Sequence, residues 1–138
     1  MSATATSSEL RRTSGDRSLL VTALRLDALM SGLSGIVLAA AAPALDGLLG
    51  VPASFLVPLG LLLVAYAAFL VLVVRACAPG PAVKLVIAGN AVWAALSVVV
   101  VLADWLTLTT TGIVLTLLQA AAVAAFAELQ LIGLRRAR

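Results

Sequence analysis

The sequence predicts an all-α polytopic membrane protein, an up-down bundle of four transmembrane helices. Three observations carry this prediction: the composition, four apolar runs of spanning length, and the distribution of the basic residues. Of 138 residues, 63% are hydrophobic and 11% are charged, against roughly 45–50% and about 25% in soluble domains. A soluble domain of this size exposes too much surface to bury so many apolar side chains. The surplus therefore favours lipid as the surrounding medium.

The four apolar runs are each long enough to cross a bilayer, which takes roughly 20 mainly apolar residues. They cover residues 26–45, 55–74, 83–103 and 112–134. The segments between the runs are short, and short connections favour antiparallel neighbours in a helical bundle. Residues 1–24 are rich in Ser, Thr and charge, so we expect a disordered basic cytoplasmic tail there. Residues 25–138 then form the transmembrane domain.

Helix breakers mark the connectors between the runs. Pro52 follows the first connector at a place suited to the first turn of a helix. The Pro-Gly-Pro stretch at 79–81 cannot continue a helix and predicts a tight reversal. In the third connector, Thr110 or Thr111 is expected to cap the fourth helix. Pro58 lies inside the second run, which predicts either a late start or a kink.

The basic residues all fall on one side of a four-span arrangement. They are Arg11, Arg12, Arg17, Arg25, Arg75, Lys84, Arg135, Arg136 and Arg138. The first and third connectors carry none of them and contain Asp46 and Asp104 instead. The positive-inside rule then places both termini in the cytoplasm of a bacterial plasma membrane. Because the cations separate apolar runs and form no continuous stripe, we expect no nucleic-acid partner. The expected partners are the lipid bilayer and either a second copy or a larger membrane protein.

A cleaved signal peptide is the alternative for the first run. Its end, residues 39–44, consists of Ala and Pro, and small residues of this kind are typical of a cleavage site. Cleavage would leave three spans. The long charged leader and Asp27 at the start of the apolar run favour retention of the first helix.

Three polar residues from different runs fall in the cytoplasmic half of the predicted bilayer, and a polar residue at such a depth indicates a functional site by default. Asp27, Asn90 and Glu128 form this candidate intramembrane polar cluster. Its functional interpretation has Glu128 as the titratable group and Asn90 as its hydrogen-bond partner. The alternative is a set of hydrogen bonds that lock helices together, with Glu128 paired to Arg25 or Arg75.

The chain contains no histidine and one cysteine, Cys77. The usual zinc sites, haem ligation and His-dependent catalysis therefore lack their central residues. We expect no catalytic residue, no metal site, no cofactor and no enzymatic activity. The basic residues of the first segment are candidate contacts for anionic lipid headgroups, at about 1 kcal/mol per cation. These are Arg11, Arg12, Arg17 and Arg25; the alternative is that they act only as the topology signal.

Several short features lie between Leu24 and Arg136. They include Leu-Arg-Leu-Asp-Ala-Leu at 24–29, Asn90 with Trp93, and Ile-Gly-Leu-Arg-Arg at 132–136. In these features the chain resembles uncharacterised small four-helix integral membrane proteins of high-GC actinobacteria. The resemblance implies the four-span fold and brings no activity. We therefore predict a non-enzymatic accessory, scaffold or regulatory membrane subunit. The alternative is a minimal oligomeric transporter or channel that uses the intramembrane polar cluster.

Overall fold

The computed structural model describes residues 2–76 and 80–137, which form five α-helices. They are α1 (Ser2–Ala40), α2 (Ala42–Leu49), α3 (Ala53–Arg75), α4 (Gly80–Leu102) and α5 (Thr110–Arg136). Four of them, all except α2, are long and apolar enough to cross a membrane. The all-helical class predicted from the sequence is thereby confirmed.

The N-terminal segment differs from the disordered tail expected over residues 1–24. From Ser2 onward these residues are helical and continue without interruption into the first apolar run; Met1 lies outside the described residues. Once a helix has nucleated in the apolar run, each added residue gains a backbone hydrogen bond, so a helix extends readily into a neighbouring polar segment. Composition alone does not predict that the helix continues into the polar segment.

The first apolar run, expected to be helical over 26–45, is broken at Ala41. Pro43 lies in the first turn of α2, where its missing N–H leaves no hydrogen bond unmade. In one continuous helix its ring would clash with the carbonyl of Ala39. The chain therefore stops at Ala40 and restarts as the short helix α2.

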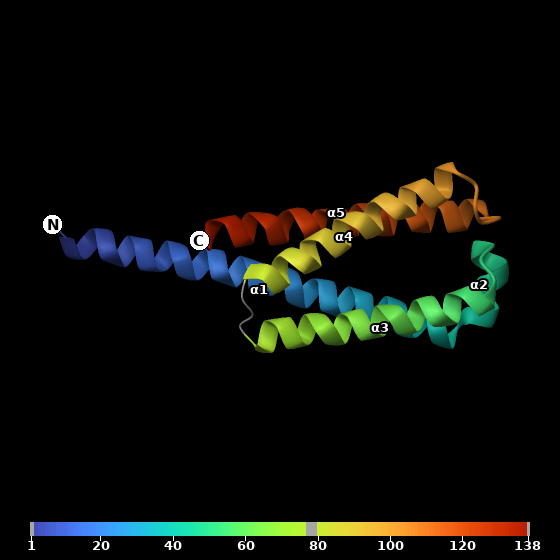
Figure 1. Cartoon of the computed structure of the whole chain (residues 1–138), viewed down its shortest axis with the longest axis horizontal. Coiled ribbons are helices and arrows are strands. Elements are labelled where there is room, and N and C mark those ends of the chain that lie inside the picture. Colours follow the sequence, from blue (N-terminus) through green and yellow to red (C-terminus); the bar gives the residue numbers. More distant parts are fainter. Residues whose placement is uncertain (1, 77–79, 138) are drawn as a thin grey trace.

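Packing among the long helices does not simply follow chain order (Figure 1). α1 packs against both α3 and α5, and α4 packs against α5, whereas α3 and α4 scarcely touch. We expected every pair of consecutive long helices to pack together, and α3 and α4 differ from that expectation. Figure 1 also shows the N-terminal part of α1 and the end of α5 at one end of the molecule. α2 and the connection from α4 to α5 lie at the opposite end.

Small residues on α1, α3 and α5 let α1 lie close to both of its neighbours. A Cβ at Gly60 of α3 would stand 2.5 Å from the carbonyl oxygen of Gly35 and 2.6 Å from the amide of Ala39. On the other side, a Cβ at Gly133 of α5 would stand 3.0 Å from the Cα of Leu20. Such close approach of backbones is the usual role of small residues between membrane-type helices.

Apolar side chains form two separate cores, one toward each end of the molecule. The first core consists of Leu20, Leu24, Ala28, Leu70, Val73, Val83, Val86 and Leu134. The second core consists of Ala42, Val51 and Leu56, next to α2.

Backbone and threonine hydrogen bonds join the two connecting segments at the α2 end. The amide of Thr109 donates to the carbonyl of Leu49 over 3.0 Å, and the Thr109 hydroxyl donates to the carbonyl of Leu48 over 2.5 Å. Gly50 adopts a φ of 74°, and a Cβ there would collide with the carbonyl oxygen of Thr107. A glycine is therefore required at position 50 both by its conformation and by the space available.

The helix caps at this end differ in detail from the expected ones. The Thr109 side chain accepts a hydrogen bond from the amide of Gly112 at 3.0 Å, so the cap of α5 lies one residue before the expected Thr110 or Thr111. Asp46 accepts from the amide of Ala53, the first residue of α3, at 3.0 Å. Because α3 begins before Pro58, that proline lies within the helix and the late start considered from the sequence is wrong.

Candidate functional site: a buried polar cluster

Five polar side chains meet in the interior, and together they come from all four long helices. Asp27 and Ser31 belong to α1, Tyr66 to α3, Asn90 to α4 and Gln130 to α5. We call these five residues the polar cluster. Its members are joined by side-chain hydrogen bonds between helices that are otherwise apolar.

Asp27 accepts the largest number of hydrogen bonds in the polar cluster. Its Oδ2 atom accepts from Asn90 Nδ2 at 2.6 Å and from Gln130 Nε2 at 2.8 Å. Its Oδ1 atom accepts from the hydroxyl of Ser31, one turn further along α1, at 3.2 Å. All three contacts place a donor group against an oxygen atom of the Asp27 side chain.

Asn90 connects the carboxylate to the remaining members. Its Oδ1 atom accepts from the Tyr66 hydroxyl at 2.8 Å, while its Nδ2 atom also lies 3.2 Å from Gln130 Oε1. The amide therefore uses both its oxygen and its nitrogen, and it links α3, α1 and α5 to α4. A side chain with one donor group and one acceptor group is suited to this bridging position.

Three members of the polar cluster are buried, whereas Ser31 and Tyr66 are half-buried. Asp27 is 1% exposed, Asn90 3% and Gln130 0%. Among residues 6–12, 14–76 and 80–137, whose side chains the structure describes, no buried side-chain nitrogen or oxygen lacks a hydrogen-bond partner. In the same part of the chain, no basic side chain pairs with Asp27, and the ion pair observed joins Arg136 to Asp16 at 4.0 Å. The hydrogen bonds that Asp27 accepts therefore come from the neutral side chains of Ser31, Asn90 and Gln130.

The structure brings together two of the three polar residues singled out from the sequence. Asp27 and Asn90 are in direct contact, whereas Glu128 is exposed and makes no ion pair with Arg25 or Arg75 among the described residues. Gln130 contributes from α5 instead. Two residues apart on a helix means a rotation of about 200°, so Glu128 and Gln130 point to nearly opposite sides.

A sequence signal for Gln130 does exist, in its spacing from a second glutamine. Gln119 lies eleven residues earlier, which is about three full helical turns, so the two glutamines share one face of α5. Gln119 accepts from the Trp93 indole at 2.9 Å and donates to Ser97 at 2.8 Å. This second set of hydrogen bonds joins α5 to α4 alone, and it shows that the same face of α5 carries both polar contacts.

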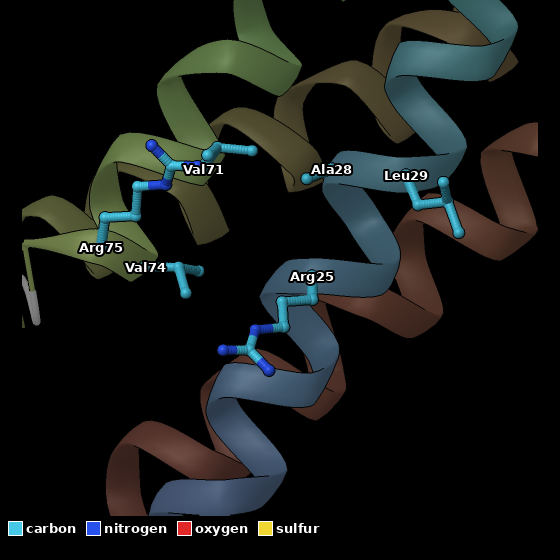
Figure 2. Close-up of a pocket in the computed structure, with 6 residues that line it drawn as sticks. All are labelled: Arg25, Ala28, Leu29, Val71, Val74 and Arg75. Atoms are coloured by element: carbon cyan, nitrogen blue, oxygen red, sulfur yellow. The ribbon is translucent and has the colours of Figure 1, made fainter.

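The four arginines proposed as lipid contacts all lie on α1 and are exposed. They are Arg11, Arg12, Arg17 and Arg25. Arg25 alone among them lines an open hollow between α1 and α3, together with Arg75 at the end of α3. Figure 2 shows Arg25 extending from α1 toward α3, with Arg75 on the far side beside Val71.

The polar cluster offers hydrogen-bond donors and acceptors, one carboxyl group (Asp27) and one phenol (Tyr66). In the part of the chain that the structure describes, no three His, Cys, Asp or Glu residues are grouped so that they could hold a metal ion. No protein-family model, curated protein or solved structure matches this chain. Its function therefore has to be inferred from the site and from the helices that build it.

Proposed function

We propose that this chain is a non-enzymatic integral membrane protein, an accessory, scaffold or regulatory subunit of the bacterial plasma membrane. It crosses the bilayer four times as an up-down bundle, with both termini in the cytoplasm. The observation that carries this proposal is the polar cluster, which takes at least one side chain from every long helix. Side-chain hydrogen bonds that join several helices hold those helices in register, which is the role expected of a structural subunit.

Helix lengths and surfaces support the membrane location. α3 and α4 each contain 23 residues, or about 35 Å at 1.5 Å per residue, enough for a hydrocarbon core of about 30 Å. Large apolar side chains cover the outward faces of the bundle, among them Leu62, Leu72, Leu85, Leu102 and Leu118. In water such surfaces would be unfavourable, whereas in lipid they need no partner.

The length of α1 supports a cytoplasmic extension. Its 39 residues extend over about 58 Å, so the helix is too long to be contained in the bilayer. The extra length lies on the N-terminal side, where Arg11, Arg12 and Arg17 are exposed. Basic residues immediately outside a span favour the cytoplasmic leaflet.

Single-cysteine labelling tests this topology. With Cys77→Ser as background, Asp104→Cys should react with a membrane-impermeant maleimide on intact cells. Arg135→Cys should react only after the inner membrane is permeabilised. Equal labelling of the two variants on intact cells, or labelling of Arg135→Cys alone, would contradict the proposed orientation.

Site-specific photo-crosslinking in native membranes tests the subunit role. A photoreactive residue is introduced singly at Leu62 on α3, Val92 on α4 and Leu118 on α5, all exposed apolar positions. A subunit that docks through one face should give a discrete protein adduct from one position, and the other two positions act as matched controls. Absence of an adduct from all three, together with a monodisperse monomer in mild detergent, would overturn the role.

The second candidate is a minimal oligomeric transporter or channel, and one observation favours it. Asp27 is a buried carboxyl group without a basic partner in the described part of the chain, and intramembrane carboxyl groups of this kind serve in proton relays. Proton or cation flux into proteoliposomes distinguishes the two functions. Flux that is lost in Asp27→Asn and kept in Glu128→Gln, an exposed control on α5, would replace the subunit role with transport.

A further inference from the structure

An open hollow of about 370 Å³ lies between α1 and α3, near the end of the bundle where α3 finishes. Its lining combines two kinds of side chain. Ala28 and Leu29 of α1 and Val71 and Val74 of α3 form an apolar floor, and Arg25 and Arg75 stand at its sides (Figure 2). We call this hollow the arginine groove.

The two arginines of the groove are available to bind an anion. Both are exposed, and neither forms an ion pair with a carboxylate among the described residues. Asp27, two residues after Arg25, is turned away into the polar cluster, because two positions along a helix differ by about 200°. The positive charge at the groove is therefore not neutralised by the nearest acidic residue.

We propose that the arginine groove binds one anionic phospholipid. Its phosphate lies between the guanidinium groups of Arg25 and Arg75, and an acyl chain covers the apolar floor. Guanidinium groups are well suited to phosphate because they donate two parallel hydrogen bonds, and basic pockets between helices on the cytoplasmic side are suited to anionic headgroups. The inference rests on the membrane location proposed above.

Charge and shape both indicate this occupant. A free anion would use the arginines and leave the apolar floor uncovered, whereas an uncharged lipid would cover the floor and leave the arginines unmatched. An anionic phospholipid satisfies both parts of the lining. In the proposed topology Arg25 marks the inner end of the membrane-spanning part of α1 and Arg75 the inner end of α3, at the level of lipid phosphates.

Native mass spectrometry of the full chain in mild detergent tests the proposal. The chain is mixed with dioleoyl phosphatidylglycerol or with dioleoyl phosphatidylcholine, and the fraction carrying one bound lipid is compared. We expect a preference for phosphatidylglycerol that falls about fivefold with either Arg25→Gln or Arg75→Gln, and further with both. Lys84→Gln and Arg135→Gln remove exposed charges from outside the groove and should change the preference by less than about twofold.

Two further arms of the experiment distinguish a lipid in the groove from a free anion bound to the arginines. Val71→Trp should lower lipid binding by filling the floor, whereas Val92→Trp, on the exposed face of α4, should not. Competition by inorganic phosphate as strong as that by dioleoyl phosphatidylglycerol would overturn the lipid assignment. Arg25→Lys with Arg75→Lys should keep most of the preference, because the charges remain.

Alkaline extraction of cell membranes keeps failure of this proposal distinct from failure of the proposed function. If the chain stays in the membrane pellet but its lipid preference is unchanged in the Arg25→Gln, Arg75→Gln variant, only the lipid site is wrong. If the chain is extracted as a peripheral protein, both proposals are wrong.

Discussion

Asn90 Nδ2 lies 2.6 Å from Asp27 Oδ2, although the two residues are 63 positions apart in the chain. Their helices, α4 and α1, have no pair of Cα atoms within 8 Å among the described residues. The two side chains therefore bridge a gap that the backbones do not close. Side chains, both polar ones and those of the first apolar core, connect α4 to α1 where the backbones are not in close contact.

Substitution of Asn90 should destabilise the protein, and a charged replacement should do so more than a neutral one. Asn90→Ala leaves Asp27, Tyr66 and Gln130 each without one partner and should lower the free energy of unfolding by about 1–3 kcal/mol. Asn90→Asp places a second carboxylate beside Asp27, and the loss should reach about 3–5 kcal/mol. Titration with a denaturing detergent in mixed micelles measures both values. Glu128→Ala, at an exposed position, should stay within about 0.5 kcal/mol of the unsubstituted chain.

Glycine substitutions should have opposite effects at two positions. Gly60→Ala puts a Cβ 2.5 Å from the carbonyl oxygen of Gly35, and overpacking of this kind lowers stability by about 1–3 kcal/mol. A Cβ at Gly89 would meet nothing within 4 Å, so Gly89→Ala should raise stability by about 0.5–1 kcal/mol. The same unfolding titration compares them. Equal effects at the two sites would show that α1 and α3 are not in the close contact described.

The hydrogen bond between Asp46 and the start of α3 should contribute measurably to the stability of the protein. Asp46→Ala removes the acceptor for the amide of Ala53, and loss of one hydrogen bond lowers the free energy of unfolding by about 0.5–1.5 kcal/mol. Ser54→Ala changes an exposed neighbour on the same turn and is the matched control. A loss no larger than that of Ser54→Ala would argue against the Asp46 contact.

Trp93 fluorescence should report the contact between α4 and α5. In a Trp105→Phe background, Trp93 is the remaining tryptophan, and its indole donates to Gln119 at 2.9 Å. Gln119→Leu removes this acceptor, so the emission maximum should shift to shorter wavelength as the ring loses its polar partner. Gln130→Leu changes the polar cluster on the same face of α5 and should not shift the emission maximum of Trp93.

The helices could be predicted from the sequence because their signals are local. Apolar runs of about 20 residues and the Pro-Gly-Pro stretch at 79–81 are enough to place four long helices. The break at Ala41 is harder to predict, although Pro43 signals it, because the run is apolar on both sides of that proline. The helical N-terminal segment escapes prediction because it depends on its continuity with the apolar part of α1.

The polar cluster could be predicted only in part, because its members are selected by helical phase and by packing. Asp27 and Asn90 stand out as polar residues in apolar runs. Glu128 stands out more strongly than Gln130, since it is charged, but which of the two faces inward depends on the side of α5 that meets α1. The contact of Leu20 with Gly133 determines that side, and nothing in the sequence pairs these two positions.

The hydrogen bonds between Thr109 and residues 48–49 have a consequence for motion. They fasten the connection before α5 to the end of α2, so the α1–α3 and α4–α5 pairs are tied together there. At the opposite end α3 and α4 have little direct contact. α4 nevertheless begins only five residues after α3 ends, so the chain itself ties the two helix pairs together beside the arginines as well. A change in the angle between the pairs must therefore be taken up along the helices and not by opening at one end.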